Sequence, residues 1–198
     1  MDHPLAGATA AWQAVVDDME ATAAEYRESG WTVVEVHPGD VTPLPPVHDP
    51  SVGDGRVGLD VVVSGDEFRD LQERVESVSF DSFEAYRAEQ GDLVLALLVM
   101  QATEAKLAVL VPLYYGVAKA RAMLDRAAAK GRLRTFLRPL SDDERVVFEQ
   151  SDPTPLFPAD YEPGGDDAED ADTDATADDA EDADTDATAD DGDEEGTD

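Results

Sequence analysis

The sequence predicts a single α+β domain over residues 1–160, made of an N-terminal helix and a mainly antiparallel sheet. Three observations support this prediction: a helical period of apolar residues near the start, a β-α-β-β order that occurs twice, and a change of composition near residue 161. About 160 residues are enough to bury a hydrophobic core without disulfides or metal ions. We expect residues 161–198 to form a disordered acidic tail.

The first expected element is a helix between Pro4 and Gly30. Proline is favoured at the first helical position, and glycine is favoured just after the last turn. Apolar residues recur three or four positions apart, as one face of a helix requires. These residues are Leu5, Ala8, Trp12, Val15, Val16, Met19, Ala23 and Tyr26.

A strand over residues 31–37 is expected next, and then a proline-rich loop. Pro43, Pro45, Pro46 and Pro50 lie close together, so we expect no regular structure in this loop.

The remaining elements form two units with the order β-α-β-β. In the first unit, Ser64 to Glu67 has the capping-box pattern that opens a helix. The expected elements of this unit are a strand at 57–63, a helix to about 78, and strands at 80–89 and 93–101. Those of the second unit are a strand at 107–111, a helix at 117–130, and strands at 132–138 and 145–150. We interpret the repeated order as an internal pseudo-repeat, and chance similarity between amphipathic strands is the alternative.

Two such units are expected to form one mixed or mainly antiparallel sheet, with both crossover helices on one face. Residues 93–100 are apolar at every position, which predicts a central strand buried on both sides. The second face of the sheet therefore needs a cover. The N-terminal helix or a second copy of the chain would provide it.

The chain is strongly acidic, with 47 Asp and Glu against 14 Lys and Arg and a formal net charge of −33. Residues 164–198 hold 18 of the acidic residues and no basic one, so 29 acidic and 14 basic residues precede them, a balance of −15. Such an excess destabilises a compact protein through self-repulsion unless concentrated salt screens it. Together with the absence of Ile and Asn, it predicts a protein from an extreme halophile. The first residues lack the basic and apolar regions of a secretory signal, so we expect a cytoplasmic protein.

Several classes of protein are unexpected on composition. The chain has no Cys, which excludes disulfides and thiolate zinc sites. Its longest apolar runs are 8 and 12 residues, shorter than the roughly 18 that a membrane helix needs. Residues 166–177 recur identically at 178–189 without an apolar side chain larger than Ala, which predicts disorder. We expect no cofactor, no resident metal ion and no membrane association.

Residues 119–138 stand out because they hold seven of the 14 basic residues and one acidic residue, a local charge of +6. Guanidinium groups bind carboxylate and phosphate bidentately, and an aromatic ring beside them can stack on a base. Helical and strand spacing places most of these residues on two faces. The candidate ligand-binding residues are Lys119, Arg126, Lys130, Arg132, Arg134, Phe136 and Arg138.

Local ion pairing is the simpler explanation of this basic segment. Arg134 would face Glu149 across the predicted hairpin, and Arg121 would pair with Asp125 along the helix. Concentrated salt also weakens phosphate binding steeply, which makes nucleic acid an unexpected partner.

The histidines His3, His37 and His48 have no metal-binding spacing. His37 ends a predicted strand and lies near Asp40, and catalytic residues are often found at strand ends. No motif fixes a mutual geometry, so a small enzyme that uses His37 is only an alternative. The other carboxylates considered for it belong to Glu35, Asp60 and Glu84.

Several short segments resemble an uncharacterised family of small haloarchaeal proteins, known only as a domain of unknown function. The resemblance covers about residues 5–158 and implies no activity, cofactor or functional residue. The segments are EATAAEYRESGW at 20–31, VHPGDV at 36–41, GLDV at 58–61, VPLYY at 111–115 and RPL at 138–140.

The sequence therefore favours a non-catalytic interaction or accessory protein, with an unknown protein or a second copy of the chain as partner. Binding of an anionic ligand or nucleic acid through residues 119–138 is the first alternative, and an enzyme using His37 is the second.

Overall fold

A computed structural model describes residue 5 and residues 7–45, 57–141 and 143–164. The chain divides into two units, residues 1–165 and 166–198, and the described residues all lie in the first. Residues 165–198 of the predicted acidic tail, including its repeat, fall outside the described residues. Residues 161–164 were also expected to be disordered, but they are described, and Tyr161 and Glu162 contact helix α3 (Val117–Lys130).

The described part of the chain contains three α-helices, eight strands and a short 3₁₀ helix. In chain order they are α1 (Thr9–Glu28), β1 (Thr32–Glu35), β2 (Asp40–Leu44), β3 (Gly58–Val63), α2 (Gly65–Val75), β4 (Ser82–Gln90), β5 (Leu93–Ala102), β6 (Leu107–Gly116), α3 (Val117–Lys130), β7 (Arg132–Pro139), β8 (Val146–Ser151) and η2 (Thr154–Leu156). The α+β class, the N-terminal helix and the repeated β-α-β-β order are all confirmed.

The strands form two four-stranded sheets rather than the single sheet that we expected. Sheet A has the order β1-β6-β5-β4, and sheet B has the order β2-β3-β7-β8. Two pairings, β1 with β6 and β3 with β7, are parallel, and the other four are antiparallel. In each β-α-β-β unit the first strand joins one sheet and the hairpin joins the other, so the two units exchange strands between the sheets.

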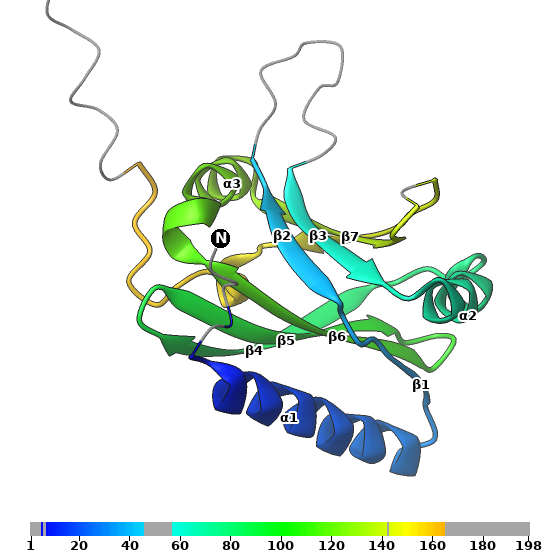
Figure 1. Cartoon of the computed structure of the whole chain (residues 1–198). Coiled ribbons are helices and arrows are strands. Elements are labelled where there is room, and N and C mark those ends of the chain that lie inside the picture. The colour runs from blue at the N-terminus through cyan, green and yellow to red at the C-terminus, as the bar shows by residue number, and fades with distance from the viewer. Residues whose placement is uncertain (1–4, 6, 46–56, 142, 165–198) are drawn as a thin grey trace, which may run out of the picture. The chain divides into compact units, whose positions relative to one another are not determined.

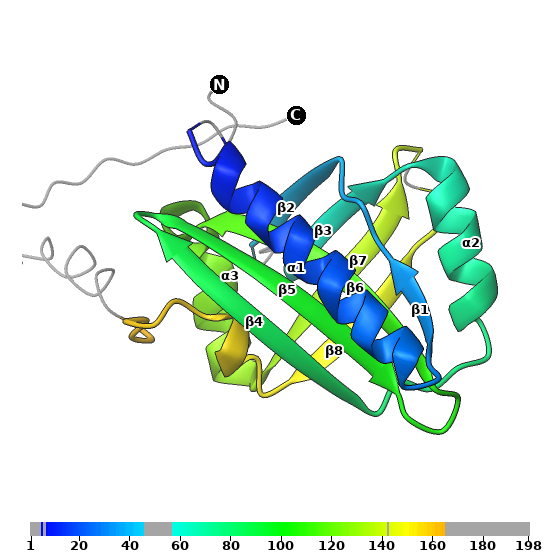
Figure 2. The ribbon, with the colours of Figure 1, turned by 90° about the horizontal axis from the view of Figure 1, so that it is seen from below.

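Sheet A is a middle layer, with α1 on one face and sheet B on the other (Figure 1). Figure 2, seen from the side of α1, shows this helix crossing β5 and β6. The helix buries Val15, Met19 and Ala23. β5 is buried at nearly every position, as its uninterrupted apolar sequence predicted. The N-terminal helix is therefore the cover of sheet A.

Two contacts fix which side chains of β5 face each neighbour. The Gln101 amide donates a hydrogen bond to the Tyr26 hydroxyl of α1, whereas the Gln150 amide of β8 donates to the Met100 sulfur. Side chains alternate along a strand. Leu98 therefore faces sheet B together with Met100.

Helices α2 and α3 lie at opposite ends of the sheets rather than on one face, and that part of the prediction was wrong (Figures 1 and 2). The reason is the connectivity: α2 leads from β3 in sheet B to β4 in sheet A, and α3 leads from β6 in sheet A to β7 in sheet B. Each helix closes one end of the space between the sheets, where α2 buries Phe68 and Leu71.

Strand β2 is an element that the sequence did not predict, because Pro43 lies within it. Proline lacks an amide hydrogen and is tolerated in strands chiefly at a sheet edge. β2 is the edge strand of sheet B and pairs only with β3, with Pro43 opposite Leu59. Pro45 is described outside the strand, and Pro46 and Pro50 lie outside the described residues.

The segment after β8 returns to the core. Leu156 and Phe157 are buried, and the Tyr115 hydroxyl of β6 donates a hydrogen bond to the Leu156 carbonyl. Among the described residues, no helix has the length and apolar character required to cross a membrane.

Candidate anion-binding site on helix α3 and strand β7

A left-handed turn brings two halves of the basic segment together. Gly131 has φ of 62° and ends α3, so the chain turns directly into β7. Arg126 and Lys130 in the last turns of the helix thereby come beside Arg132 and Arg134 at the start of the strand. A helix end with partial negative charge also stabilises cations in its last turn.

These four basic residues and Val57 line a hollow of about 20 Å³. One water molecule needs about 10–15 Å³ on this measure. The hollow therefore has room for a single anionic oxygen or a similar small group, not for a whole metabolite.

Gly58 allows the backbone of β3 to approach β7 beside this hollow. A Cβ atom at this position would overlap the Arg134 carbonyl oxygen and would lie 3.0 Å from the Phe136 ring. A larger residue would push the strands apart. The glycine therefore sets the position of Val57 against the basic side chains.

The two ion pairs expected from the sequence are present. Arg134 Nε lies 2.9 Å from Glu149 Oε2 across the β7–β8 hairpin, and Arg121 Nε lies 3.5 Å from Asp125 Oδ1 along α3. The Tyr161 hydroxyl donates a 2.6 Å hydrogen bond to Asp125. Burial is the main cause that raises the pKa of Tyr161, and this hydrogen bond is the second. Asp125 is thus held within a contact between α3 and the C-terminal segment.

The other three candidate residues do not line the hollow. Lys119 is exposed on α3, nearly two turns before Arg126. Phe136 is only 5% exposed, so its ring is not presented to a base. Arg138 Nε donates to both carboxylate oxygens of Asp60 at 3.0 and 2.8 Å, and Asp60 is itself buried.

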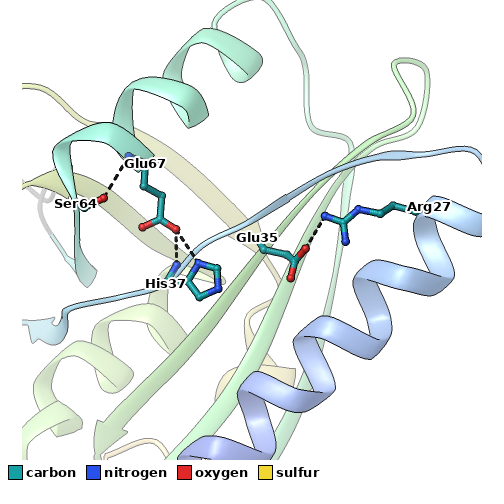
Figure 3. Close-up of polar contacts among 5 residues, drawn as sticks. All are labelled: Arg27, Glu35, His37, Ser64 and Glu67. Atoms are coloured by element: carbon teal, nitrogen blue, oxygen red, sulfur yellow. Dashed lines mark hydrogen bonds and ion pairs between the residues drawn. The ribbon is translucent and has the colours of Figure 1, made fainter.

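His37 contacts a carboxylate that the sequence did not identify as its partner (Figure 3). Glu67 Oε1 accepts a 2.7 Å hydrogen bond from the His37 backbone N–H and lies 3.0 Å from its Nδ1. Ser64 caps α2 by accepting from the Glu67 N–H at 3.3 Å. The expected capping box is therefore half formed, because the Glu67 carboxylate binds His37 in place of the Ser64 N–H.

The four carboxylates proposed for an enzyme have other contacts. Glu35 pairs with Arg27 of α1, and Asp60 pairs with Arg138. The Tyr114 hydroxyl donates to Asp40, and the Tyr86 hydroxyl donates to Glu84.

The His37 side chain is 60% exposed, so water is not excluded around it as general acid–base chemistry favours. The Arg27–Glu35 pair anchors β1 to α1, and the contact of His37 with Glu67 anchors the segment just after β1 to α2 (Figure 3). Within the described ranges, no three His, Cys, Asp or Glu side chains are grouped to hold a metal ion.

A family model described as a family of unknown function (DUF7529) matches residues 1–158. No curated protein and no solved structure matches the chain.

Proposed function

The chain belongs to DUF7529, a family of unknown function, and we propose that it is a non-catalytic interaction module. It holds an acidic segment of a partner protein at the hollow between α3 and β7. We place it in the cytoplasm of an extreme halophile, in agreement with its acidic composition.

The observation that carries this proposal is the convergence of four cations from two elements in a body with a balance of −15. Each arginine has five N–H donors in a planar group, so it can bind a partner carboxylate in addition to contacts within the chain. Arg134 is an example, because its Nε contacts Glu149. A carboxylate in the hollow would contact several cations together.

Salt decides whether an acidic ligand can approach an acidic protein. In dilute buffer the negative charge of the body repels such a ligand over a long range. In molar salt the Debye length falls to about 3 Å, so only groups in contact attract or repel. The hollow therefore binds an acidic peptide under the salt conditions that also stabilise the body.

A protein partner suits this surface better than a nucleic acid does. Single-stranded nucleic acids need a continuous basic groove and aromatic rings on which bases stack. Phe136 is buried, and the acidic side chains of Glu149 and Asp60 interrupt the same face of sheet B. A short acidic segment needs only the local hollow.

The test uses the full chain in about 3 M KCl, where charge acts only at contact, and a fluorescein-labelled glutamate peptide as the probe. The double variant Lys130→Gln with Arg132→Gln removes two exposed cations of the hollow. Fluorescence anisotropy should show Kd rising about tenfold, since two partly exposed contacts contribute about 1–2 kcal/mol together.

The control is Arg69→Gln with Arg74→Gln, which removes the same charge from two α2 arginines paired with Asp66 and Asp70. It should change Kd by less than about twofold. Equal effects of the two double variants would show that the hollow is not the site. Displacement of the peptide by single-stranded RNA at equal charge concentration would instead identify a nucleic-acid surface.

A further inference from the structure

A second and larger cavity of about 470 Å³ lies at the α2 end of the molecule, away from the basic hollow. It is bounded by the C-terminal turn of α2, the segment before β4, β5 of sheet A and the edge strand β8 of sheet B. Cavities of about 300–1,000 Å³ with mainly apolar walls are typical of small-molecule sites.

The apolar wall is held by contacts within the core. Phe80 and Phe148 pack edge to face with ring centroids 4.9 Å apart. Met100 is 3% exposed and accepts a hydrogen bond from the Gln150 amide. Val75 and Val78 complete this wall from the α2 side. A ligand would therefore meet a formed wall in which apolar side chains lie beside polar ones.

The cavity also has one basic residue in its lining. Arg145 directly precedes β8, and its Nε atom is buried. Guanidinium binds a carboxylate with parallel N–H donors. Glu76 and Glu149 are the acidic residues of the lining and are exposed.

We infer that this cavity binds a small monocarboxylic acid with an apolar body. The carboxylate contacts Arg145, and the body packs against Phe80, Met100 and Phe148. A second negative charge on the ligand would meet Glu76 and Glu149, so dicarboxylic acids bind more weakly. The cavity shares no lining residue with the proposed protein-binding hollow, although Glu149 of the cavity pairs with Arg134 of the hollow.

The test measures binding by isothermal titration calorimetry to the full chain in molar KCl. The probes are octanoate, octanol and octanedioate, which share a chain length and differ in charge. Octanoate should saturate one site, and the other two should bind at least about tenfold more weakly, because each loses or opposes the carboxylate contact. Absence of saturable octanoate binding would overturn the inference.

Two variants locate the site. Arg145→Gln should abolish the preference for octanoate over octanol while octanol binding stays unchanged. A loss of folded protein would weaken the binding of both ligands, so it could not produce this change in the ratio of the two Kd values. Val75→Phe fills part of the cavity from the half-buried end of α2 and should weaken both ligands about tenfold or more.

Lys130→Gln with Arg132→Gln should leave octanoate binding unchanged, which separates this inference from the proposed function. An unaltered preference in Arg145→Gln would remove the assigned role of Arg145.

Discussion

Sheets A and B have the same number of strands but very different surroundings. The central strands β5 and β6 of sheet A are covered on both faces and buried at nearly every position. β7 of sheet B instead buries Leu133, Thr135 and Leu137 on its inner face, while its other face carries arginines around the buried ring of Phe136. The charged face holds Arg134, Arg138, Glu149 and Asp60.

The difference shows how this chain separates stability from recognition. Burial of apolar area is the main favourable term in folding, and sheet A supplies much of it. The outer face of sheet B adds little burial, so it can carry the ion pairs and the basic hollow. Variants in the two sheets should consequently have unequal effects.

The largest expected effect is a cavity in the layer between the sheets. Leu98 of β5 is fully buried and faces sheet B. Leu98→Ala should lower the free energy of unfolding by about 3 kcal/mol, because transfer and cavity terms add. Urea denaturation in molar KCl, followed by circular dichroism, measures the change.

The matched change on sheet B is Val147→Ala on the outer face of β8. Val147 is 48% exposed, so its truncation should cost less than about 0.5 kcal/mol. A cost for Val147→Ala comparable to that of Leu98→Ala would contradict the assignment of stability to sheet A.

A smaller effect is expected from the deeply placed ion pair between Asp60 and Arg138 in sheet B. Asp60 is 7% exposed and binds Arg138, whose side chain is 19% exposed. Loss of one partner from a fully buried pair costs 3–5 kcal/mol. Because Arg138 keeps some contact with water, Asp60→Asn should cost about 2 kcal/mol in the same urea experiment.

Glu149→Gln is the control, because it also converts the carboxylate partner of a β7 arginine to an amide. The Glu149 side chain is 42% exposed, so the change should cost less than about 1 kcal/mol. If both variants were equally stable, the Asp60–Arg138 pair would be no stronger than a surface pair.

The local sequence predicted the elements of this fold far better than their assembly. The apolar run of β5 predicted a buried strand, and the capping pattern from Ser64 to Glu67 predicted the start of α2, because these signals depend only on neighbouring residues. Alternation does not specify which strands pair, so the division into two sheets was missed. β2 was missed because a proline is compatible with a strand only at an edge, and edge position is a property of the assembled sheet.

The same distinction applies to the candidate site. Arg126, Lys130, Arg132 and Arg134 meet because the helix turns directly into the strand, which the sequence predicted. The contact of His37 with Glu67 joins residues 30 positions apart, and no short motif encodes it. The burial of Phe136 likewise depends on packing around β7. The sequence therefore could not show that its ring is unable to stack on a base.

The smallest expected effect at neutral pH comes from a tyrosine of sheet A. The described strands of sheet B contain no tyrosine, so ionisation of tyrosine affects the strands of sheet A alone. Burial raises the pKa of Tyr115, whose hydroxyl donates to the Leu156 carbonyl. The unfolded chain loses this proton near pH 10, while the folded state keeps it. Stability from Tyr115 is therefore complete below about pH 10 and is lost as pH rises above that value.

Tyr115→Phe should cost about 1 kcal/mol at pH 8, the usual contribution of one buried hydrogen bond. Its unfolding free energy should then fall less steeply than that of the natural chain above about pH 10, by up to 1.4 kcal/mol per pH unit for one proton. Tyr86→Phe is the comparison, because Tyr86 is 54% exposed and a hydrogen bond to Glu84 raises its pKa to about 12. It should cost almost nothing at pH 8. Parallel pH profiles for Tyr115→Phe and the natural chain would mean that Tyr115 ionises without unfolding sheet A.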